Sequence, residues 1–250
     1  MDPHDPLAPP GSQITLSGDG TSLTVDLYSA EGMALVSTLW TKLAAEFRLM
    51  YEPRWMGVPI IQPPDDMVMM QELIWKVRPD VIVECGVAHG GSAVFYASMC
   101  SLLGTGRVLG VEVELRPHNR EALEHHPMRD LIEVIDGSSI DAATFAQVKA
   151  NVGDAGTVLV VLDSNHSRSH VAQELALYHQ LVTPGSYLVA MDGSQGLVWD
   201  IPRGKREWRE DNPAPAIHEF VQLHPEFCID PYFTRLHVTS NRDGFLRRTS

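Results

Sequence analysis

The sequence has little of what marks secreted, membrane-spanning or disulfide-rich chains. Its 250 residues include only three cysteines, Cys85, Cys100 and Cys228, with no CxxC pair, which argues against a disulfide scaffold or a structural zinc site. No run approaches the roughly 20 apolar residues that cross a bilayer. Residues 1–20 also lack the basic and apolar regions of a signal peptide. We therefore expect a cytoplasmic protein with reduced thiols and no membrane span.

Basic residues are scarce as well. Nineteen Lys and Arg stand against 32 Asp and Glu, which gives a formal net charge of −13. Affinity for nucleic acid comes largely from Lys and Arg that neutralise phosphates, so we expect no nucleic-acid partner. The chain is 44% hydrophobic, and at about 100 to 200 residues per domain it can form one large α/β domain or two small ones.

Beyond residue 80, short β-rich runs alternate with stretches long enough for helices. Such alternation predicts an α/β fold, a parallel sheet with helices on both faces. A turn signal at Asn241-Arg242-Asp243-Gly244 predicts a C-terminal antiparallel hairpin between residues 236–239 and 244–247. The expected parallel strands are residues 81–84, 108–112, 132–135, 158–162 and 187–191.

The first part of the chain is less regular. Residues 1–20 carry four prolines and three glycines and predict a mobile arm or a strand-like segment laid on a partner. A helix is expected over residues 35–50, and a second helix should be capped at Asp65 or Asp66 and stop at Arg78-Pro79. We divide the chain into an arm and helix (1–54) and a main domain (55–250), and the arm with the early helix suggests a homo-oligomer.

In parallel α/β sheets, ligands bind at the carboxyl ends of the strands. The first such end is acidic, at Glu84, and opens into a glycine-rich turn that brings a ligand close to bare backbone. The turn is not the dinucleotide motif GxGxxG, and no lysine supplies a nucleotide-triphosphate loop. Glycine required only for a tight turn is the alternative. The expected cofactor-binding residues here are Glu84, Gly86, Gly90, Gly91 and Ser92.

The next two strand ends are also polar. Glu112 stands where a ribose diol would be held, although alone it could equally be a solvated surface charge. An adenine ring could lie against the small polar groups at the third strand end, which are Asp136, Gly137, Ser138 and Ser139. Two successive strand ends thus carry an acidic residue, and the third carries small polar residues. This combination favours an adenosyl ligand.

Two further strand ends carry Asp163 and Asp192, which neighbouring strands would bring to one rim. Two carboxylates with amides or hydroxyls nearby suit Mg²⁺ or a related divalent cation. Solvated or helix-capping aspartates are the alternative. His166 lies at the same rim and could take a proton near neutral pH, although a lone histidine is often structural.

A polar loop, residues 193–216, could close over a glycoside or polyketide, or could simply be solvated. Its aromatic and basic residues are Trp199, Arg203, Lys205, Arg206, Trp208 and Arg209.

At these residues the chain resembles the "cephalosporin hydroxylase" group of methyltransferases, which includes rhamnosyl O-methyltransferases. The resemblance runs from about residue 55 to the C-terminus. The motifs that carry it are Glu84-Cys85-Gly86 with Gly90-Gly91-Ser92, Leu162-Asp163-Ser164-Asn165-His166-Ser167, His170-Val171, Glu174-Leu175, Pro184-Gly185-Ser186-Tyr187 and Asp243-Gly244-Phe245-Leu246.

The resemblance implies a Rossmann-like class I methyltransferase fold with a mostly parallel seven-stranded sheet. It also implies that S-adenosylmethionine binds at Glu84, Gly86, Gly90, Gly91, Ser92, Glu112 and residues 136–139, in contact with Asp163, and that a divalent metal binds at Asp163 and Asp192. Relatives commonly carry an acidic pair at the fifth strand end, whereas here Met191 precedes Asp192. Asn165, His166, water or substrate would then complete the metal shell, or the metal is bound more weakly.

From these observations we expect an O-methyltransferase that acts on a deoxysugar hydroxyl of a glycosylated natural product or glycolipid, as in antibiotic biosynthesis. Asp163 and His166 are the expected catalytic residues. Two rivals remain. One is an S-adenosylmethionine-binding accessory subunit without activity, suggested by Met191. The other is an NAD-dependent oxidoreductase, against which the absent GxGxxG counts.

Overall fold

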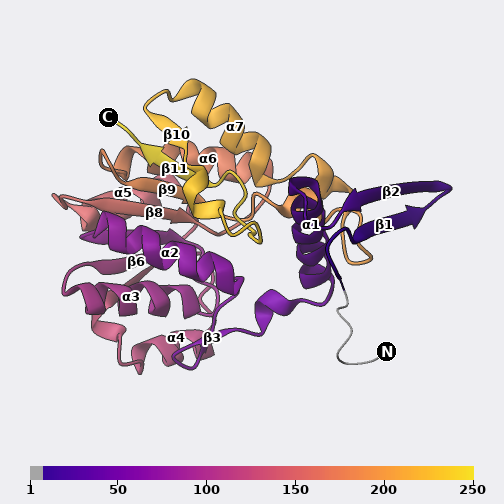
Figure 1. The fold of residues 1–250 in the computed structure, drawn as a ribbon. Coiled ribbons are helices and arrows are strands. Elements are labelled where there is room, and N and C mark those ends of the chain that lie inside the picture. Colours follow the sequence, from indigo (N-terminus) through magenta and orange to yellow (C-terminus); the bar gives the residue numbers. More distant parts are fainter. Residues whose placement is uncertain (1–7) are drawn as a thin grey trace.

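A seven-stranded sheet forms the centre of the structure, a computed structural model that describes residues 8–250 (Figure 1). Its strands lie in the order β10-β11-β9-β8-β5-β6-β7, and neighbouring strands from β9 to β7 pair in parallel. The five predicted parallel strands are therefore confirmed, with ends that differ by one residue at most. The strands are β5 (Val81–Cys85), β6 (Arg107–Glu112), β7 (Ile132–Asp136), β8 (Val158–Leu162), β9 (Tyr187–Ala190), β10 (Phe227–Ile229) and β11 (Phe245–Arg248).

Helices cover both faces of this sheet (Figure 1). On one face Leu73 and Leu123 belong to the same apolar core as Ile82 of β5. On the other face Val148 and Leu175 share a core with Val83. Successive residues of β5 thus pack into opposite cores, as expected of a strand whose two faces are both buried. The predicted α/β class is confirmed. The first face carries α2 (Pro64–Val77), α3 (Gly91–Leu103) and α4 (Pro117–Glu124), and the second carries α5 (Ala142–Val152), α6 (Arg168–Tyr178) and α7 (Pro213–Leu223).

The predicted C-terminal antiparallel pair exists, but its first strand is β10 and not residues 236–239, so a long connection joins the two strands in place of the predicted tight turn. β11 pairs antiparallel with β9 on one side and with β10 on the other. Residues 236–239 form no strand, because His237 takes a left-handed φ of +67° and Thr239 and Ser240 bond instead to the carboxylate of Asp66. The turn signal at Asn241–Gly244 therefore marks the entry to β11 and not the tip of a hairpin.

The N-terminal segment stands apart from the sheet. A hairpin of β1 (Gln13–Gly18) and β2 (Thr21–Asp26) points away from the main body beyond helix α1 (Figure 1). The prediction for residues 1–20 falls partly outside the described residues, and the described part contains the first strand of this hairpin and its turn. Helix α1 spans Ala30–Glu46, earlier than predicted, because Ser29 caps it by accepting from Gly32 N at 3.0 Å.

Helix α2 begins at Pro64, with Pro63 as its N-cap. Neither Asp65 nor Asp66 caps it, so that prediction was wrong. Pro64 has no N–H to satisfy at the first helical position, and Asp66 is fully buried in another set of hydrogen bonds.

Short elements complete the chain, and no helix of residues 8–250 is long and apolar enough to cross a bilayer. These elements are β3 (Arg54–Trp55), β4 (Val58–Pro59) and the single-turn helices η1 (Leu49–Tyr51), η2 (Arg129–Leu131), η3 (His179–Leu181), η4 (Gln195–Leu197), η5 (Arg206–Arg209) and η6 (Pro231–Thr234).

Candidate functional site

The glycine-rich turn after β5 is fixed by contacts with two neighbouring strands. Gly86 has a φ of +93°, and a Cβ added there would lie 2.1 Å from the carbonyl oxygen of Asp163 at the end of β8. On the other side, the N–H groups of Val87 and Ala88 donate to one carboxylate oxygen of Glu112, at 2.9 and 2.8 Å. The turn therefore needs glycine at this position for sterics, and it joins the ends of β5, β6 and β8.

Two cavities meet along this turn. The first has a volume of about 500 Å³ and the second about 540 Å³. Their shared wall consists of Gly86, Ala88, His89, Asp163 and Ser164. A ligand in one cavity therefore lies directly beside a ligand in the other, which suits transfer of a group between two bound molecules.

The second cavity gathers most of the side chains predicted for an adenosyl ligand. Glu112 and the stretch Gly137-Ser138-Ser139 line it. The Glu112 carboxylate is already engaged with the glycine turn and also accepts from Glu114 N at 3.2 Å. Asp136 does not reach the cavity, because its side chain is exposed and paired with Arg120.

At the second cavity, sequence reasoning missed Asn119, and it named the members of a hydrogen-bonded network separately without predicting that they meet. Asn119 donates to the carbonyl of Ala88 at 2.9 Å and so braces the turn from α4. His170 Nε2 lies 3.1 Å from the hydroxyls of both Ser139 and Ser164, and that Ser164 hydroxyl donates to buried Glu174 at 2.6 Å. The only sequence signal for this network was the pair His170 and Glu174, one helical turn apart in α6.

The remaining members of the predicted turn motif differ in where they lie. Gly91 and Ser92 line the first cavity at the start of α3. Gly90 lines neither cavity and packs against Leu123. Glu84 lies beneath the turn, fully buried, with no hydrogen-bond partner for either carboxylate oxygen. An unpaired buried carboxylate of this kind favours a cation nearby.

Burial raises the pKa of Glu84 to about 8, and the negative Glu112 adds to the rise. In the unfolded chain this carboxyl ionises near pH 4.5, so its contribution to stability is fully present below that pH and is lost as the pH rises through about 8. At neutral pH the ligand-free protein therefore holds Glu84 mostly protonated. A cation bound near the turn would favour its ionised form.

Asp163, His166 and Asp192 form a compact donor set at the rim of the first cavity. One ligand atom from each lies within 4.8 Å of the others, and His166 Nε2 is 3.1 Å from Asp192 Oδ2. Burial, with the nearby charges of Asp192 and Glu84, raises the pKa of Asp163 well above its usual value. Two carboxylates and one imidazole in partly open surroundings can hold a divalent cation.

Asp192 is linked through Asn241 and Ser240 to buried Asp66, for which the sequence predicted only a helix cap. Asp192 has a left-handed φ of +59°, and its N–H donates to the side chain of Asn241 at 3.1 Å. Both Ser240 N and the Ser240 hydroxyl donate to Asp66 at 2.8 Å. Burial raises the pKa of Asp66 to about 6. Met191 packs in the apolar core, so the residue that replaces an expected acid does not face the rim.

The first cavity is roofed by segments far apart in the sequence. Thr41, Ala45 and Arg48 reach it from α1 and the turn that follows, and Val198, Ile201, Arg203 and Trp208 reach it from the loop of residues 193–216. The two segments are tied together, since Lys42 binds Asp200 at 2.6 Å and Arg203 N donates to Glu46 at 3.0 Å. Of the residues predicted for a lid, Trp199 lies under Arg209 and Trp208 under Lys205.

The chain is similar to known proteins in both sequence and fold. The family model for rhamnosyl O-methyltransferase/CmcI matches residues 47–249. Rhamnosyl O-methyltransferases of Mycobacterium tuberculosis and Mycobacterium leprae are each 30% identical, over 143 and 142 residues. These matches cover 56% of this chain, and 56% and 60% of the two relatives, so the similarity spans little more than half the length of either.

Solved structures agree on the fold. One of CmcI, described with Mg and SAM, superposes with a TM-score of 0.59 at 18% identity, over 80% of this chain and 78% of the other. A second, of CmcI with SAH, has a TM-score of 0.57 at 17% identity, over 79% and 83%. The predicted Rossmann-like class I methyltransferase fold is thus confirmed. The match of the family model over residues 47–249 shows that the chain belongs to the rhamnosyl O-methyltransferase/CmcI family.

Proposed function

We propose that this chain is an S-adenosylmethionine-dependent O-methyltransferase that needs a divalent cation, with Mg²⁺ as the favoured ion. The observation that carries the proposal is the meeting of two cavities at Asp163, beside the donor set completed by His166 and Asp192. Family membership supports it. The second cavity would take the cofactor, and the first would take the acceptor.

The second cavity suits the cofactor in shape and charge. Glu112 would hold the ribose hydroxyls at the end of β6, with residues 137–139 along the adenine. Gly86 allows the backbone of the turn to lie close to a ligand, and buried Glu84 beneath the turn could ionise when a cationic ligand binds. When bound, S-adenosylmethionine supplies a methyl group attached to a positively charged sulfur. The sulfur is a good leaving group because it departs as part of a neutral thioether.

The residues at the rim must align the acceptor hydroxyl and remove its proton. Asp163 and Asp192 would hold the cation, whose chemistry is to make a bound hydroxyl more acidic. His166, with Nε2 3.1 Å from Asp192 Oδ2 and its side chain 28% exposed, is placed either to receive the proton or to serve as a third ligand. The carboxylate of Asp192 holds the imidazole in position for either role.

We propose a sugar hydroxyl, on a rhamnose-like deoxysugar of a glycosylated natural product or glycolipid, as the acceptor. Neighbouring hydroxyls of such a ring can bind one cation through two oxygens, which suits the open side of the donor set. Trp208, Ile201 and Tyr51 give the first cavity apolar surfaces for the faces of a sugar ring or an attached aglycone. The names of the mycobacterial relatives support the same class of acceptor.

Titration calorimetry tests the cofactor directly. The purified protein should bind S-adenosylmethionine with micromolar affinity and should bind NAD far more weakly, because the turn after β5 lacks the dinucleotide glycine pattern. A preference for NAD, or no binding of S-adenosylmethionine, would overturn the proposed function. Rhamnosylated acceptors that gain the mass of one methyl group would separate an active enzyme from an accessory subunit.

A chelator tests the cation. Methyl transfer should fall to background after treatment with EDTA and return on addition of Mg²⁺, since the rim offers mostly hard oxygen ligands. Cofactor binding, followed by calorimetry on the same samples, should change only a few-fold. Full activity in the presence of excess chelator would exclude this mechanism.

We also propose that two copies of the chain associate through α1. Met33, Val36, Trp40, Leu43 and Phe47 are 40% to 69% exposed. Their spacing of three and four residues puts them on one face of the helix, as in the seam of two paired helices. A second copy of α1 would cover this face, and the projecting hairpin beside it adds exposed apolar area.

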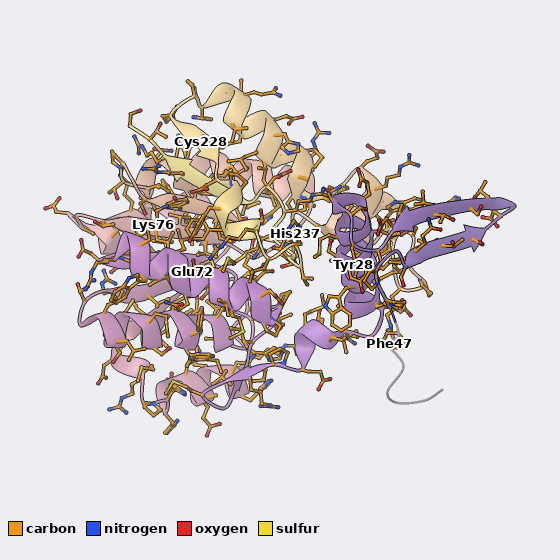
Figure 2. All side chains as sticks on the ribbon, in the orientation of Figure 1. Tyr28, Phe47, Glu72, Lys76, Cys228 and His237 are labelled. Atoms are coloured by element: carbon orange, nitrogen blue, oxygen red, sulfur yellow. The ribbon has the colours of Figure 1, made fainter. Side chains whose placement is uncertain are left out.

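Figure 2 shows Tyr28 and Phe47 on this N-terminal segment, on the side that carries the hairpin. Leu43→Glu should convert a dimer or larger assembly to single chains, because it puts a charge in the middle of the apolar seam. Light scattering coupled to gel filtration measures the mass. The control is Leu102→Glu, since Leu102 is 80% exposed on α3, away from the seam. A wild-type protein that is monomeric at high concentration would contradict this proposal.

A further inference from the structure

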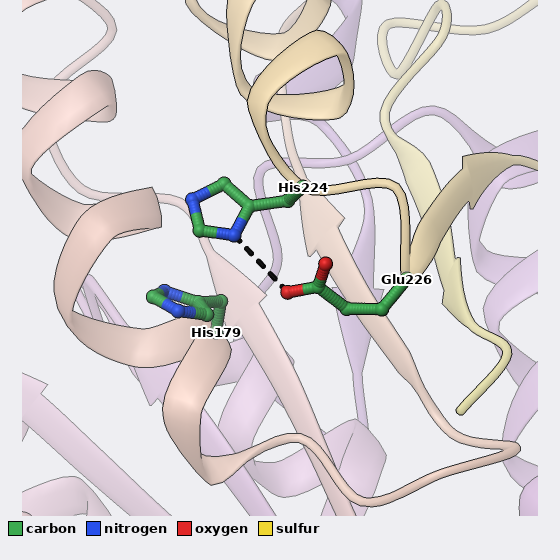
Figure 3. Close-up of side chains that lie close together, drawn as sticks. All are labelled: His179, His224 and Glu226. Carbon is green, nitrogen blue, oxygen red and sulfur yellow. Dashed lines mark hydrogen bonds and ion pairs between the residues drawn. The ribbon is translucent and has the colours of Figure 1, made fainter.

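A second cluster of potential metal ligands lies at the amino ends of strands β9 and β10, the opposite end of the strands from the first site. Figure 3 shows His179, His224 and Glu226 converging from three segments. His179 follows the C-terminus of α6, His224 follows α7, and Glu226 immediately precedes β10. Helix α6 starts near His166 and ends beside His179, and its 11 residues span about 16 Å. The two clusters are therefore separate.

The spacing of the three donor groups suits a small ion. One ligand atom from each residue lies within 4.8 Å of the others, and His224 Nδ1 is 3.1 Å from Glu226 Oε1. A tetrahedral Zn²⁺ with bonds of about 2.0–2.1 Å needs neighbouring donors roughly 3.3 Å apart. The pair His224 and Glu226 already has this spacing, and a donor atom of His179 lies within 4.8 Å of both.

The surroundings hold the histidines in an orientation suited to ligation. His179 Nδ1 is 2.9 Å from the carbonyl oxygen of Leu175, so it carries the proton there and leaves Nε2 with a free lone pair. A hydrogen bond from the other ring nitrogen to a carbonyl is the arrangement that typically fixes metal-bound histidine. The ring of His224 stacks on Phe220, with centroids 4.3 Å apart, which limits its rotation.

The positively charged side chain of Arg248 does not occupy the proposed metal site. Arg248 is close enough to influence His179, but its guanidinium donates to the carbonyls of Val182 and Ser250, at 2.6 and 2.9 Å. His179, His224 and Glu226 are each half-buried, so solvent reaches the cluster and can supply a fourth ligand.

We propose that His179, His224 and Glu226 bind one Zn²⁺ ion, with water as the fourth ligand. The ion joins the end of α6 to the connection between α7 and β10. Strand β10 has only three residues and lies at the edge of the sheet, where β11 is its single partner. Zinc bound here stabilises the folded chain, because the unfolded chain offers no assembled site.

The test is the zinc stoichiometry of the full chain, freed of metal and then dialysed against micromolar Zn²⁺. The rim residues also offer a possible zinc site, so Asp192→Asn is the background that reports on the new site alone. In that background we expect one tightly bound ion, an increase in thermal unfolding temperature with Zn²⁺, and loss of both on adding Glu226→Gln. Gln keeps the size of Glu and can still accept a hydrogen bond from His224, so this variant should fold.

Co²⁺ provides a second readout, because four-coordinate Co²⁺ with imidazole ligands absorbs visible light much more strongly than six-coordinate Co²⁺ with oxygen ligands. The absorption should appear in Asp192→Asn and vanish on adding His224→Gln or Glu226→Gln. The matched control is Glu219→Gln, an exposed acid on α7 that lies outside the cluster, which should change neither readout. Equal zinc binding with and without Glu226→Gln, or no binding in Asp192→Asn, would overturn the proposal.

Discussion

Asp192→Asn should reduce methyl transfer by about a thousandfold or more while changing the affinity for S-adenosylmethionine only a few-fold. Lewis-acid activation of a hydroxyl is worth several kcal/mol, and each 1.36 kcal/mol is a factor of ten in rate. Asp192 lines the first cavity and not the second, so the cofactor site should survive its replacement. The measurements are product mass with a rhamnosylated acceptor and cofactor titration by calorimetry.

Asp243→Asn is a closely matched control for this change. Asp243 also has a left-handed φ, +58°, and also lies 3.0 Å from a histidine, His218, but at an exposed surface. Asn tolerates this backbone conformation well, so both variants should fold. If Asp192→Asn loses cofactor binding together with turnover, the cation has been assigned to the wrong cavity.

Gly86→Ala should weaken cofactor binding by at least about a hundredfold and lower the free energy of unfolding by about 1–3 kcal/mol. The added Cβ would meet the carbonyl oxygen of Asp163 at 2.1 Å and Ser164 Cα at 2.7 Å. Both contacts are with backbone, so the turn or the end of β8 must move. Either movement displaces the wall that separates the two cavities. Calorimetry and urea denaturation measure the two effects.

Gly185→Ala is the control for Gly86→Ala, because it separates the effect of a steric clash from the effect of backbone strain. Gly185 has a similar φ of +85°, but nothing lies within 4 Å of its added Cβ. It should cost about 1 kcal/mol of stability and leave cofactor binding unchanged. Wild-type affinity in Gly86→Ala would mean that the turn does not contact the cofactor.

The sheet and the ends of its strands could be predicted from local patterns. Residues 81–85 and 158–162 form nearly unbroken apolar runs followed by polar residues, which fixed both the strands and the places of Glu84 and Asp163. Neighbouring parallel strands then bring their ends together by geometry alone. For this reason the pairing of Asp163 with Asp192 follows from the strand pattern itself.

The contacts that the sequence could not predict are those between distant segments. Nothing near Asp66 indicates that its carboxylate binds Ser240, 174 residues away, and an acid at a helix start is more often a cap. The same holds for α1, which reaches the first cavity although its pattern shows only an amphipathic helix. Residues 236–239 contain β-forming residues, but these long-range hydrogen bonds override local propensity.

The two cavities are formed by different parts of the chain, and this difference affects how proteins of this fold can diversify. The second cavity is built from strand ends, where a substitution disturbs the sheet itself. The first is roofed by α1 and the loop of residues 193–216, whose residues, apart from Ala216, do not belong to the two apolar cores of the sheet. Ion pairs of Lys42 and Glu46 join the two segments to each other. These two segments can therefore accumulate substitutions with little effect on the common core. Selection on a small part of the gene would be enough to change the shape of one cavity while the other is inherited intact.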